Sequence, residues 1–361
     1  MTRITTMEVR KTNLGDMRAV GAEAPPLAEG EARLRVERFA LTANNVTYGV
    51  VGDRIGYWRF FPASDDAWGV IPVWGVAVVE ESAAPDLPVG DRLYGYLPMA
   101  SHLTIQPAKV KAERLFDGAA HRAELPPVYN QYRRLAAEPG YDPARDEERM
   151  ILWPLYATSY CLYDFFLDNN WFGAERIIIP SASSKTAIGT AYAFGADPAA
   201  PKLIGVTSPR NEAAVRATGL YADVVAYDDV ETRIDAAAPA ALIDMSGSGA
   251  VIGRLHKHLG DAMRYTSMVG LTHYDEAGMG ADFIKNRSQM FFAPGHIQKR
   301  AQEWGPGVFD GKAMDFFTRA AGESREWLEI RRGEGGAGCR DAWNEVLAGE
   351  TPPTAAWTVA I

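Results

Sequence analysis

RIIIPSASSKTAIGTAYAFG, residues 176–195, sets the architecture expected for the second half of the chain. Its apolar, β-branched start (176–181) is typical of a buried strand, and the small residues that follow suit a helix. Similar strand patterns recur downstream, with helical stretches between them: KLIGVTS (202–208), DVVAY (223–227), AALIDMSG (240–247) and YTSMVGLT (265–272). Because strands that alternate with helices pair in parallel, this order predicts a doubly wound parallel sheet covered by helices on both faces.

The N-terminal part of the chain has a different pattern. EARLRVERFAL (31–41) alternates charged and apolar residues, which is the period of a half-buried strand. VIPVWGVAVVEES (70–82) and PVGDRLYGYLP (88–98) also indicate strands, and short strands at this spacing predict a small, bent β-barrel or sandwich. We expect the last residues, AAWTVAI (355–361), to form a strand that returns to this β-rich part.

Residues 117–150 carry prolines, tyrosines and arginines and predict a long loop with one short helix. Irregular segments of this length in a compact protein are usually functional loops or lids. A disordered insertion is the alternative reading. Tyr129, Tyr132 and Leu135 favour the functional loop because they give the segment side chains to bury.

The composition excludes several classes of protein. The chain has 361 residues and a formal net charge of −9, which argues against binding nucleic acid through phosphate attraction. No apolar stretch is long enough for a membrane helix. The first residues lack the apolar segment of a secretory signal, and the two cysteines form no disulfide framework, so we expect a cytoplasmic protein with reduced thiols. Two cysteines and six scattered histidines predict no metal site.

The order and spacing of these pieces resemble the medium-chain dehydrogenase/reductase superfamily, in particular its zinc-free quinone oxidoreductases and enoyl reductases. The resemblance runs from about residue 30 to 275 and is carried by these segments: GEARLRVERFALTANNVTYG (30–49), VWGVAVVEESAAPDLPVGDRLYG (73–95), LYATSYCLYDF (155–165), RIIIPSASSKTAIGTAYAFG (176–195), IGVTSPRNEAAVRATG (204–219) and ALIDMSGSGAVIGRLHKHL (241–259). Zinc-dependent relatives carry Gly-His-Glu where this chain has Val73, Trp74 and Gly75, so the resemblance is to the zinc-independent branch.

This resemblance implies two domains and a cofactor. A GroES-like β-barrel domain is expected over 1–150 and 315–361, with the inserted loop at 117–150, and a Rossmann dinucleotide-binding domain over 151–314. The cofactor implied is NADP(H), and relatives often form homodimers.

A dinucleotide site requires a tight turn at the end of the first strand, where backbone N–H groups at a helix start meet the pyrophosphate. Relatives place several glycines there, whereas this chain has SASSKTAIG (181–189). Small side chains still permit close approach, hydroxyls can donate to phosphate, and a lysine adds a positive charge. The alternative is that the serines simply cap a helix. The candidate pyrophosphate ligands are Ser181, Ser183, Ser184, Lys185 and Thr186.

The end of the second predicted strand favours NADP(H) over NAD. NAD sites hold the ribose hydroxyl with an acidic residue there, but this chain has Thr207, Ser208 and Arg210, which suit a 2′-phosphate. The alternative for Arg210 is a solvated arginine at a helix start. The resemblance also implies that Tyr227 lies near that phosphate. It places three further residues beside the nicotinamide: Thr158, Ser246 and Gly270.

Tyr48 is the candidate catalytic residue. The resemblance matches it to an active-site tyrosine of quinone reductases, and a phenol with an ordinary pKa of about 10 can donate a proton at neutral pH. The alternative is a tyrosine packed in the barrel with its hydroxyl satisfied by the backbone. Asn44 and Asn45, in the same segment, could hydrogen-bond to cofactor or substrate.

Aromatic residues suggest the kind of substrate. Large rings are dense between residues 48 and 74, and the 117–150 loop adds more, so a flat, apolar or aromatic substrate is expected if both regions face the site. Arg133 or Arg134 could bind an anionic group on it. For many of these rings the alternative is a place in the core or in a dimer contact. The candidate substrate-binding residues are Asn45, Tyr57, Trp74, Tyr129, Tyr132 and Arg133.

The function expected from these features is NADPH-dependent, metal-free transfer of hydride to an activated double bond or carbonyl. The loop without glycine keeps two alternatives open: a non-redox enzyme such as a lyase or hydrolase on the same fold, or an inactive nucleotide-binding protein. His296 and Lys299 are further candidates for the site, on fold analogy alone.

Overall fold

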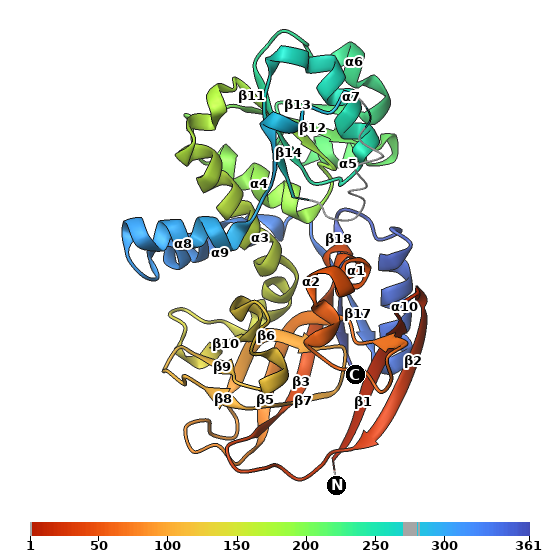
Figure 1. Ribbon diagram of the computed structural model, residues 1–361, viewed down its shortest axis with the longest axis vertical. Helices are drawn as coiled ribbons and strands as arrows, with labels where there is room; N and C mark the ends of the chain where they lie inside the picture. Colours follow the sequence, from red (N-terminus) through yellow and green to blue (C-terminus); the bar gives the residue numbers. More distant parts are fainter. Residues whose placement is uncertain (1, 270–279, 281) are drawn as a thin grey trace. The chain divides into compact units, whose positions relative to one another are not determined.

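The computed structural model describes residues 2–269, 280 and 282–361. Two compact units make up the chain (Figure 1). The β-rich unit comprises Met1–Ile151 with Glu329–Ile361, and the parallel-sheet unit comprises Leu152–Leu328. The β-rich unit is therefore built from both ends of the sequence.

The parallel-sheet unit has, within the described residues, a six-stranded sheet in which every neighbouring pair is parallel. Its strands are β11 (Arg176–Pro180), β12 (Lys202–Thr207), β13 (Asp223–Ala226), β14 (Ala240–Asp244), β15 (Met263–Met268) and β16 (Ser288–Met290). Their order across the sheet is β13-β12-β11-β14-β15-β16, the order of a Rossmann sheet. The predicted doubly wound sheet is confirmed. The order reverses between β11 and β14, and ligands of such sheets bind beyond the carboxyl ends of the strands at that point.

Helices cover both faces of this sheet. Successive residues of β11 point to opposite faces, so Ile177 and Ile179 pack under one helical layer and Ile178 under the other. The first layer contains α3 (Asp146–Asp168) and α4 (Lys185–Gly195), and the second contains α6 (Val230–Arg233) and α7 (Gly249–Leu259). α5 (Pro209–Ala217) packs beside β13 through Val215.

Gly189 lets α4 lie close to α3. A Cβ atom at this position would lie 2.5 Å from the Tyr156 ring and 2.6 Å from the Ser159 hydroxyl, both on α3. Ser159 Oγ also donates a hydrogen bond to the carbonyl of Thr186 in the first turn of α4 (2.8 Å). These contacts fix the start of α4, and they thereby fix the turn that precedes it.

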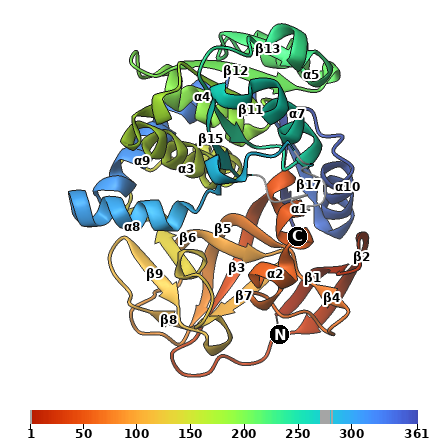
Figure 2. The ribbon, with the colours of Figure 1, turned by 45° about the horizontal axis from the view of Figure 1, so that its top comes forward.

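Two later helices, α8 (Ala293–Trp304) and α9 (Val308–Ser324), pack against α3 (Figure 2). The ring of Tyr160 on α3 stacks on Phe316 of α9 with a centroid separation of 5.7 Å. This contact extends the apolar core of the parallel-sheet unit beyond the sheet itself.

The β-rich unit contains a mixed sheet and a smaller antiparallel sheet. Its strands are β1 (Arg3–Arg10), β2 (Asn13–Glu23), β3 (Ala32–Leu41), β4 (Trp68–Gly69), β5 (Pro72–Ser82), β6 (Arg92–Pro98), β7 (His102–Ile105), β8 (Pro107–Ala108), β9 (Arg114–Asp117), β10 (Gln131–Arg134), β17 (Glu329–Glu334) and β18 (Ala355–Ala360). The larger sheet has the order β17-β18-β3-β5-β6-β10-β9-β8, with β7 paired to β3, and the smaller has the order β2-β1-β4. The C-terminal strand β18 pairs antiparallel with β3 and parallel with β17.

Part of the segment expected to be a loop over 117–150 is built into this sheet. β10 pairs antiparallel with both β6 and β9. The pairing depends on Gly95 of β6, where a Cβ atom would lie 2.5 Å from the Tyr132 ring. The Tyr132 hydroxyl then donates to the carbonyl of Tyr96 (2.8 Å). The expectation of a loop with one short helix is therefore wrong for these residues, because a contact with a distant glycine extends them into a strand.

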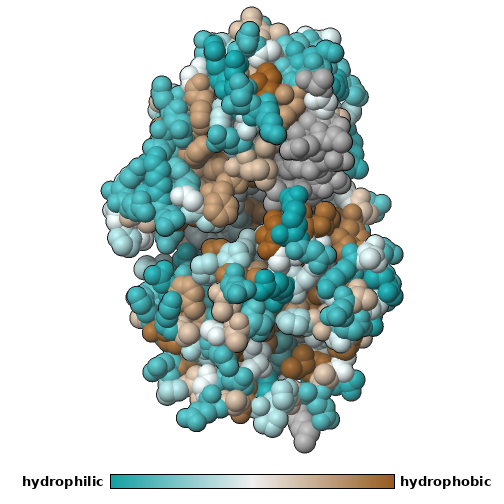
Figure 3. All heavy atoms as spheres, in the orientation of Figure 1, coloured by the Kyte–Doolittle hydropathy of each residue, from teal (hydrophilic) through white to brown (hydrophobic). Residues whose placement is uncertain are grey.

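Charged and polar side chains dominate the face of the molecule in Figure 3, with apolar patches between them. In the part of the chain that the structure describes, no helix has the length and apolar character needed to span a membrane.

Candidate functional site

A tight turn follows β11, where the dinucleotide site is expected. Ser181 has a φ of 60°, in the left-handed region that favours glycine. Its backbone N–H donates a hydrogen bond to the hydroxyl of Tyr227, which follows β13, over 3.0 Å. Ser181 therefore adopts a backbone conformation that glycine would adopt more easily. The hydrogen bond to Tyr227 stabilises this conformation.

The next serines join the turn to two helices. Ser184 caps α4, and its side chain accepts a hydrogen bond from the backbone N–H of Ala187 (3.3 Å). Ser183 Oγ accepts a hydrogen bond from Nδ2 of Asn211 in the first turn of α5 (3.2 Å). Ser184 therefore caps a helix, which was the alternative to phosphate binding for these serines. The free backbone N–H groups at a helix start still favour binding of an anion. Asn211 was missed by the sequence reasoning.

Lys185 is the first residue of α4 and is half-buried. Burial lowers the pKa of its ammonium group to about 8. A nearby anion would favour the charged form, so the position suits a phosphate oxygen. Thr186 stands next to it, and its carbonyl accepts hydrogen bonds from Ser159 and from the hydroxyl of Thr190.

The ends of β12 and β13 carry the residues expected at a 2′-phosphate. Thr207 is buried as the last residue of β12, Ser208 precedes α5, and Arg210 is exposed in the first turn of α5. An acidic residue, Glu212, shares that turn, but its carboxylate pairs with Arg216 (2.9 Å). Cationic and hydroxyl groups at this strand end are favourable for a phosphate.

Asp244, a buried residue at the carboxyl end of β14, accepts hydrogen bonds from the residues that follow the strand. Asp244 Oδ1 accepts hydrogen bonds from the backbone N–H (2.9 Å) and the hydroxyl (2.6 Å) of Ser246. Thr158 on α3 donates from its hydroxyl to the carbonyl of Pro154 (3.1 Å). Both hydroxyl oxygens keep acceptor capacity. The third candidate for the nicotinamide side, Gly270, lies outside the described residues.

In the β-rich unit, rings from distant segments form an aromatic cluster: Tyr48, Tyr57, Trp74, Tyr96 and Tyr129. Tyr48 lies on α1 (Ala43–Val50), and its ring centroid is 4.6 Å from that of Tyr57 and 5.5 Å from that of Tyr96. Tyr96 is 4.6 Å from Tyr129 and 5.2 Å from Trp74. The cluster thus combines candidates from α1, β5 and the 117–150 segment.

Tyr96 was missed by the sequence reasoning. It stands on β6 directly opposite Trp74 of β5, and Tyr94 stands on the same strand two residues earlier. Alternation along a strand places Tyr94 and Tyr96 on one face of the sheet. The pattern YGY within a predicted strand was therefore an available signal.

Three expected substrate-binding residues lie apart from the aromatic cluster. Asn45 is buried in the first turn of α1, where its side chain accepts a hydrogen bond from the backbone N–H of the N-cap residue Thr42 (2.8 Å) and donates one to the carbonyl of Pro72 (3.0 Å). Tyr132 of β10 is fully buried, and the Arg133 guanidinium is 3.7 Å from the Glu138 carboxylate. The first two side chains serve the packing of the fold in this structure.

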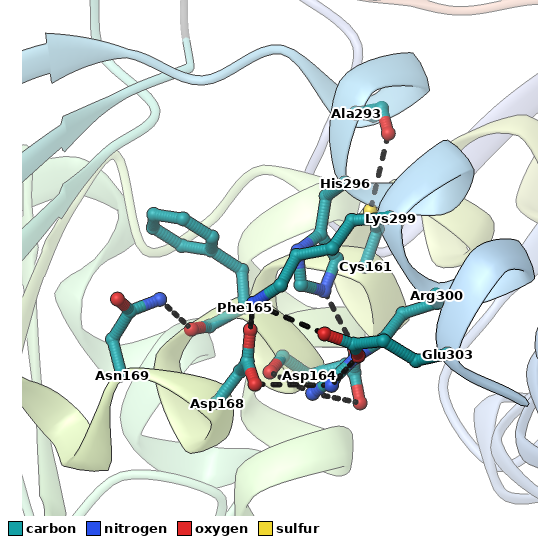
Figure 4. Close-up of polar contacts among 10 residues, drawn as sticks. All are labelled: Cys161, Asp164, Phe165, Asp168, Asn169, Ala293, His296, Lys299, Arg300 and Glu303. Carbon is teal, nitrogen blue, oxygen red and sulfur yellow. Dashed lines mark hydrogen bonds and ion pairs between the residues drawn. The ribbon is translucent and has the colours of Figure 1, made fainter.

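His296 and Lys299 belong to an ion-pair network between α3 and α8 (Figure 4). His296 Nε2 lies 2.5 Å from Oδ2 of the buried Asp164, and Arg300 Nε lies 2.6 Å from the same oxygen. Lys299 pairs with Asp168. These charges therefore connect two helices of the parallel-sheet unit.

Among the described residues, no three His, Cys, Asp or Glu side chains gather as metal ligands would. Both cysteines, Cys161 and Cys339, are buried and unpaired as disulfides. Burial raises the pKa of both thiols.

The fold combines a parallel sheet of Rossmann strand order with a GroES-like β-rich unit. It is shared by CurA from Vibrio vulnificus, at a TM-score of 0.64 and 12% identity over 99% of this chain and 98% of that one. A putative NADPH:quinone reductase from Bacillus thuringiensis matches at a TM-score of 0.60 and 13% identity over 100% of both chains. CurA in complex with NADPH matches at a TM-score of 0.64 and 12% identity over 99% of both chains.

At such identities the similarity establishes the fold. The chain belongs to the family described as "Protein of unknown function (DUF2855)", whose model matches residues 39–352. No curated protein sequence matches it.

Proposed function

We propose that this protein is an NADPH-dependent oxidoreductase that reduces an activated double bond or carbonyl of an enone- or quinone-type compound. The observation that carries the proposal is the tight turn at Ser181, at the carboxyl end of β11, where the strand order reverses. Backbone N–H groups at a helix start in this place bind pyrophosphate in dinucleotide-binding proteins. The fold shared with CurA, which was crystallised in complex with NADPH, adds support.

The cofactor's phosphates would be held by two groups of residues. The pyrophosphate group is assigned to Ser181, Ser183, Ser184, Lys185 and Thr186. The 2′-phosphate is assigned to Thr207, Ser208, Arg210 and Tyr227, because hydroxyls and a guanidinium form charge-assisted hydrogen bonds with phosphate. Thr158 and Ser246 are assigned to the nicotinamide side.

Tyr48 is the proposed proton donor. When bound, NADPH would supply the hydride that the electrophilic carbon of the substrate accepts. The substrate must also gain a proton, which the Tyr48 phenol provides before regaining one from water. Burial raises the pKa of Tyr48, so the phenol is protonated at neutral pH. The half-buried rings of Trp74 and Tyr129 favour a flat, apolar or aromatic substrate.

The experiment that tests this function uses NADPH deuterated at the transferred position with a panel of enones and quinones. The expected result is loss of nicotinamide absorbance and deuterium on the reduced product. Deuterium that stays on the cofactor with every acceptor would contradict an oxidoreductase of this class.

We also propose that the protein is a homodimer joined along β16. This strand ends the strand order of the parallel sheet, and two apolar side chains at its end, Met290 and Phe292, are 47% and 70% exposed. Exposed strand edges pair readily with a second chain. Light scattering should give the mass of two chains for the wild type and the mass of one chain for Phe292→Asp. A monomeric wild type would contradict the proposed dimer.

A further inference from the structure

The hydroxyl oxygen of Tyr48 accepts hydrogen bonds from two side chains. Asn44 Nδ2 lies 2.7 Å from it, and Trp74 Nε1 lies 3.1 Å from it. An indole nitrogen and an amide NH₂ group donate hydrogen bonds and do not accept them. Neither contact therefore uses the phenol proton of Tyr48, and both would strengthen if the oxygen became negative.

The other hydroxyls around Tyr48 are arranged differently. Tyr57 and Tyr129 hydrogen-bond to each other through their hydroxyls (3.1 Å). The Tyr94 hydroxyl is buried and has no hydrogen-bond partner among the described residues. The two N–H donors thus distinguish Tyr48 from Tyr57, Tyr129 and Tyr94, because its oxygen accepts from both donors and its proton is used by neither.

Trp74 holds its donor in a fixed place. It stands on β5 directly opposite Tyr96, within the central pairing of the mixed sheet. Its ring stacks on that of Tyr94, with centroids 5.8 Å apart and an interplanar angle of 22°. Contacts with both neighbours restrict rotation of the indole, so the N–H stays directed at the Tyr48 oxygen.

We propose that Trp74, together with Asn44, is a positioning residue for proton transfer. Their N–H groups orient the Tyr48 hydroxyl so that its proton is offered to the substrate, and they stabilise the phenolate that the transfer leaves. The O–H bond of Tyr48 breaks, a bond from that proton to the substrate forms, and the phenolate takes a proton from water. This inference rests on the proposed function, because it needs a substrate that accepts a proton.

The burial of Tyr48 explains why such donors are needed. Its side chain is 5% exposed, and a phenolate without partners would be costly there. Burial is the largest cause of its raised pKa, and the hydrogen bonds from Trp74 and Asn44 act in the opposite direction. Removing one of them should therefore slow the proton transfer and leave the binding of cofactor and substrate largely unchanged.

Trp74→Phe tests this directly, because it removes the N–H and keeps an aromatic ring. We expect kcat to fall about tenfold to a hundredfold, KM to change less than about threefold, and the solvent deuterium isotope effect on kcat to rise. Trp357→Phe is the matched control, since the indole nitrogen of Trp357 is buried without a hydrogen-bond partner among the described residues. We expect wild-type kcat from it. Equal kcat values for wild type and Trp74→Phe would overturn the inference.

Asn44→Asp is a second variant of nearly the same shape. It replaces a donor with a carboxylate, which accepts the Tyr48 proton and competes with the substrate for it. We expect kcat to fall by at least as much as in Trp74→Phe while NADPH binding persists. A fully active variant would overturn the role of Asn44.

A spectroscopic readout separates this inference from the proposed function. In a ¹⁵N-labelled protein, the indole N–H signal absent from Trp74→Phe identifies Trp74, and it should move upfield in Tyr48→Phe because a hydrogen bond is lost. The Trp357 signal should stay in place. An unmoved Trp74 signal would reject the hydrogen bond from Trp74 to Tyr48, even if the enzyme were active. A moved signal in a protein that does not bind NADPH would instead reject the proposed function, and the proton-transfer role with it.

Discussion

The backbone N–H of Ser181 donates a hydrogen bond to the hydroxyl of Tyr227 over 3.0 Å. Ser181 follows β11 and Tyr227 follows β13, and β12 lies between these strands in the sheet. The contact therefore connects the proposed pyrophosphate turn to the proposed 2′-phosphate group across the end of β12. A residue with a φ of 60° is held in place by the same tyrosine that would contact the cofactor.

Tyr227→Phe should weaken NADPH binding. The substitution removes the acceptor for Ser181 and one hydroxyl from the proposed phosphate site, so the Kd should rise about fivefold to twentyfold, equivalent to about 1–2 kcal/mol. Isothermal titration measures this directly. Tyr265→Phe is a suitable control, because the Tyr265 hydroxyl bonds at 3.4 Å to Gln289 on the neighbouring strand. The same loss in both variants would contradict a specific role for Tyr227.

NADPH affinity should fall as the pH rises above about 8. Burial lowers the pKa of Lys185 to about 8 in the free protein, and a bound pyrophosphate would raise it by favouring the ammonium form. Binding then takes up a proton above pH 8, so the contribution of Lys185 is complete below that pH and declines above it. We expect the Kd to rise up to about tenfold between about pH 7 and pH 9.5.

Lys185→Met is the control for this pH dependence. The variant should bind NADPH more weakly at neutral pH and should lose the decline above pH 8. A wild-type affinity that is constant over the range would show that Lys185 does not contact the bound cofactor.

Tyr48→Phe should reduce turnover by about a hundredfold to a thousandfold, because general acid catalysis is lost. The Kd for NADPH should stay within about twofold of wild type, since the proposed phosphate ligands are untouched. Steady-state kinetics and titration separate the two effects. Tyr94→Phe removes a buried hydroxyl that has no hydrogen-bond partner among the described residues, and it should retain activity. Full activity of Tyr48→Phe would exclude Tyr48 as the proton donor.

The network in Figure 4 should matter for stability. Asp164 is 3% exposed and faces both His296 and Arg300. Asp164→Asn removes this shared buried carboxylate, while Arg300 keeps its ion pairs with Asp168 and Glu303. We expect the free energy of unfolding to fall by about 2 kcal/mol, measured by urea denaturation. Breaking the exposed Arg319–Glu323 pair by Glu323→Gln should cost less than about 0.5 kcal/mol. Similar costs for the two variants would contradict this view of the network.

The parallel sheet could be predicted because its signal is local. Apolar, β-branched runs such as residues 176–180 become buried strands wherever helices cover both faces, and the alternation of strands and helices implies parallel pairing. β10 could not be predicted in the same way. Its four residues gain their pairing from the space that Gly95 leaves for Tyr132, which is a contact between distant parts of the sequence.

The candidate site residues also divide into those that a local sequence signal predicts and those that depend on contacts between distant parts of the sequence. The family resemblance pointed to Tyr48, and the density of rings in the sequence pointed to Tyr57, Trp74 and Tyr129. The fold brings these four side chains together. Residue type alone did not distinguish them from Tyr132, whose hydroxyl is used by the carbonyl of Tyr96. Two hydrogen-bonded pairs, Ser183–Asn211 and Ser181–Tyr227, depend on how the strand ends meet in three dimensions. No local sequence pattern predicts them.

The central claim is that the parallel-sheet unit binds NADPH through its 2′-phosphate. The most direct measurement is a fluorescence titration of the wild type and of Arg210→Ala with NADPH and with NADH, with Lys202→Ala, an exposed cation at the opposite end of β12, as control. We predict saturable NADPH binding at least tenfold tighter than NADH binding, a loss of about 1–2 kcal/mol for NADPH in Arg210→Ala, and little change for NADH or in the control. Absence of NADPH binding at about millimolar concentration, or equal losses for both cofactors in Arg210→Ala, would contradict it.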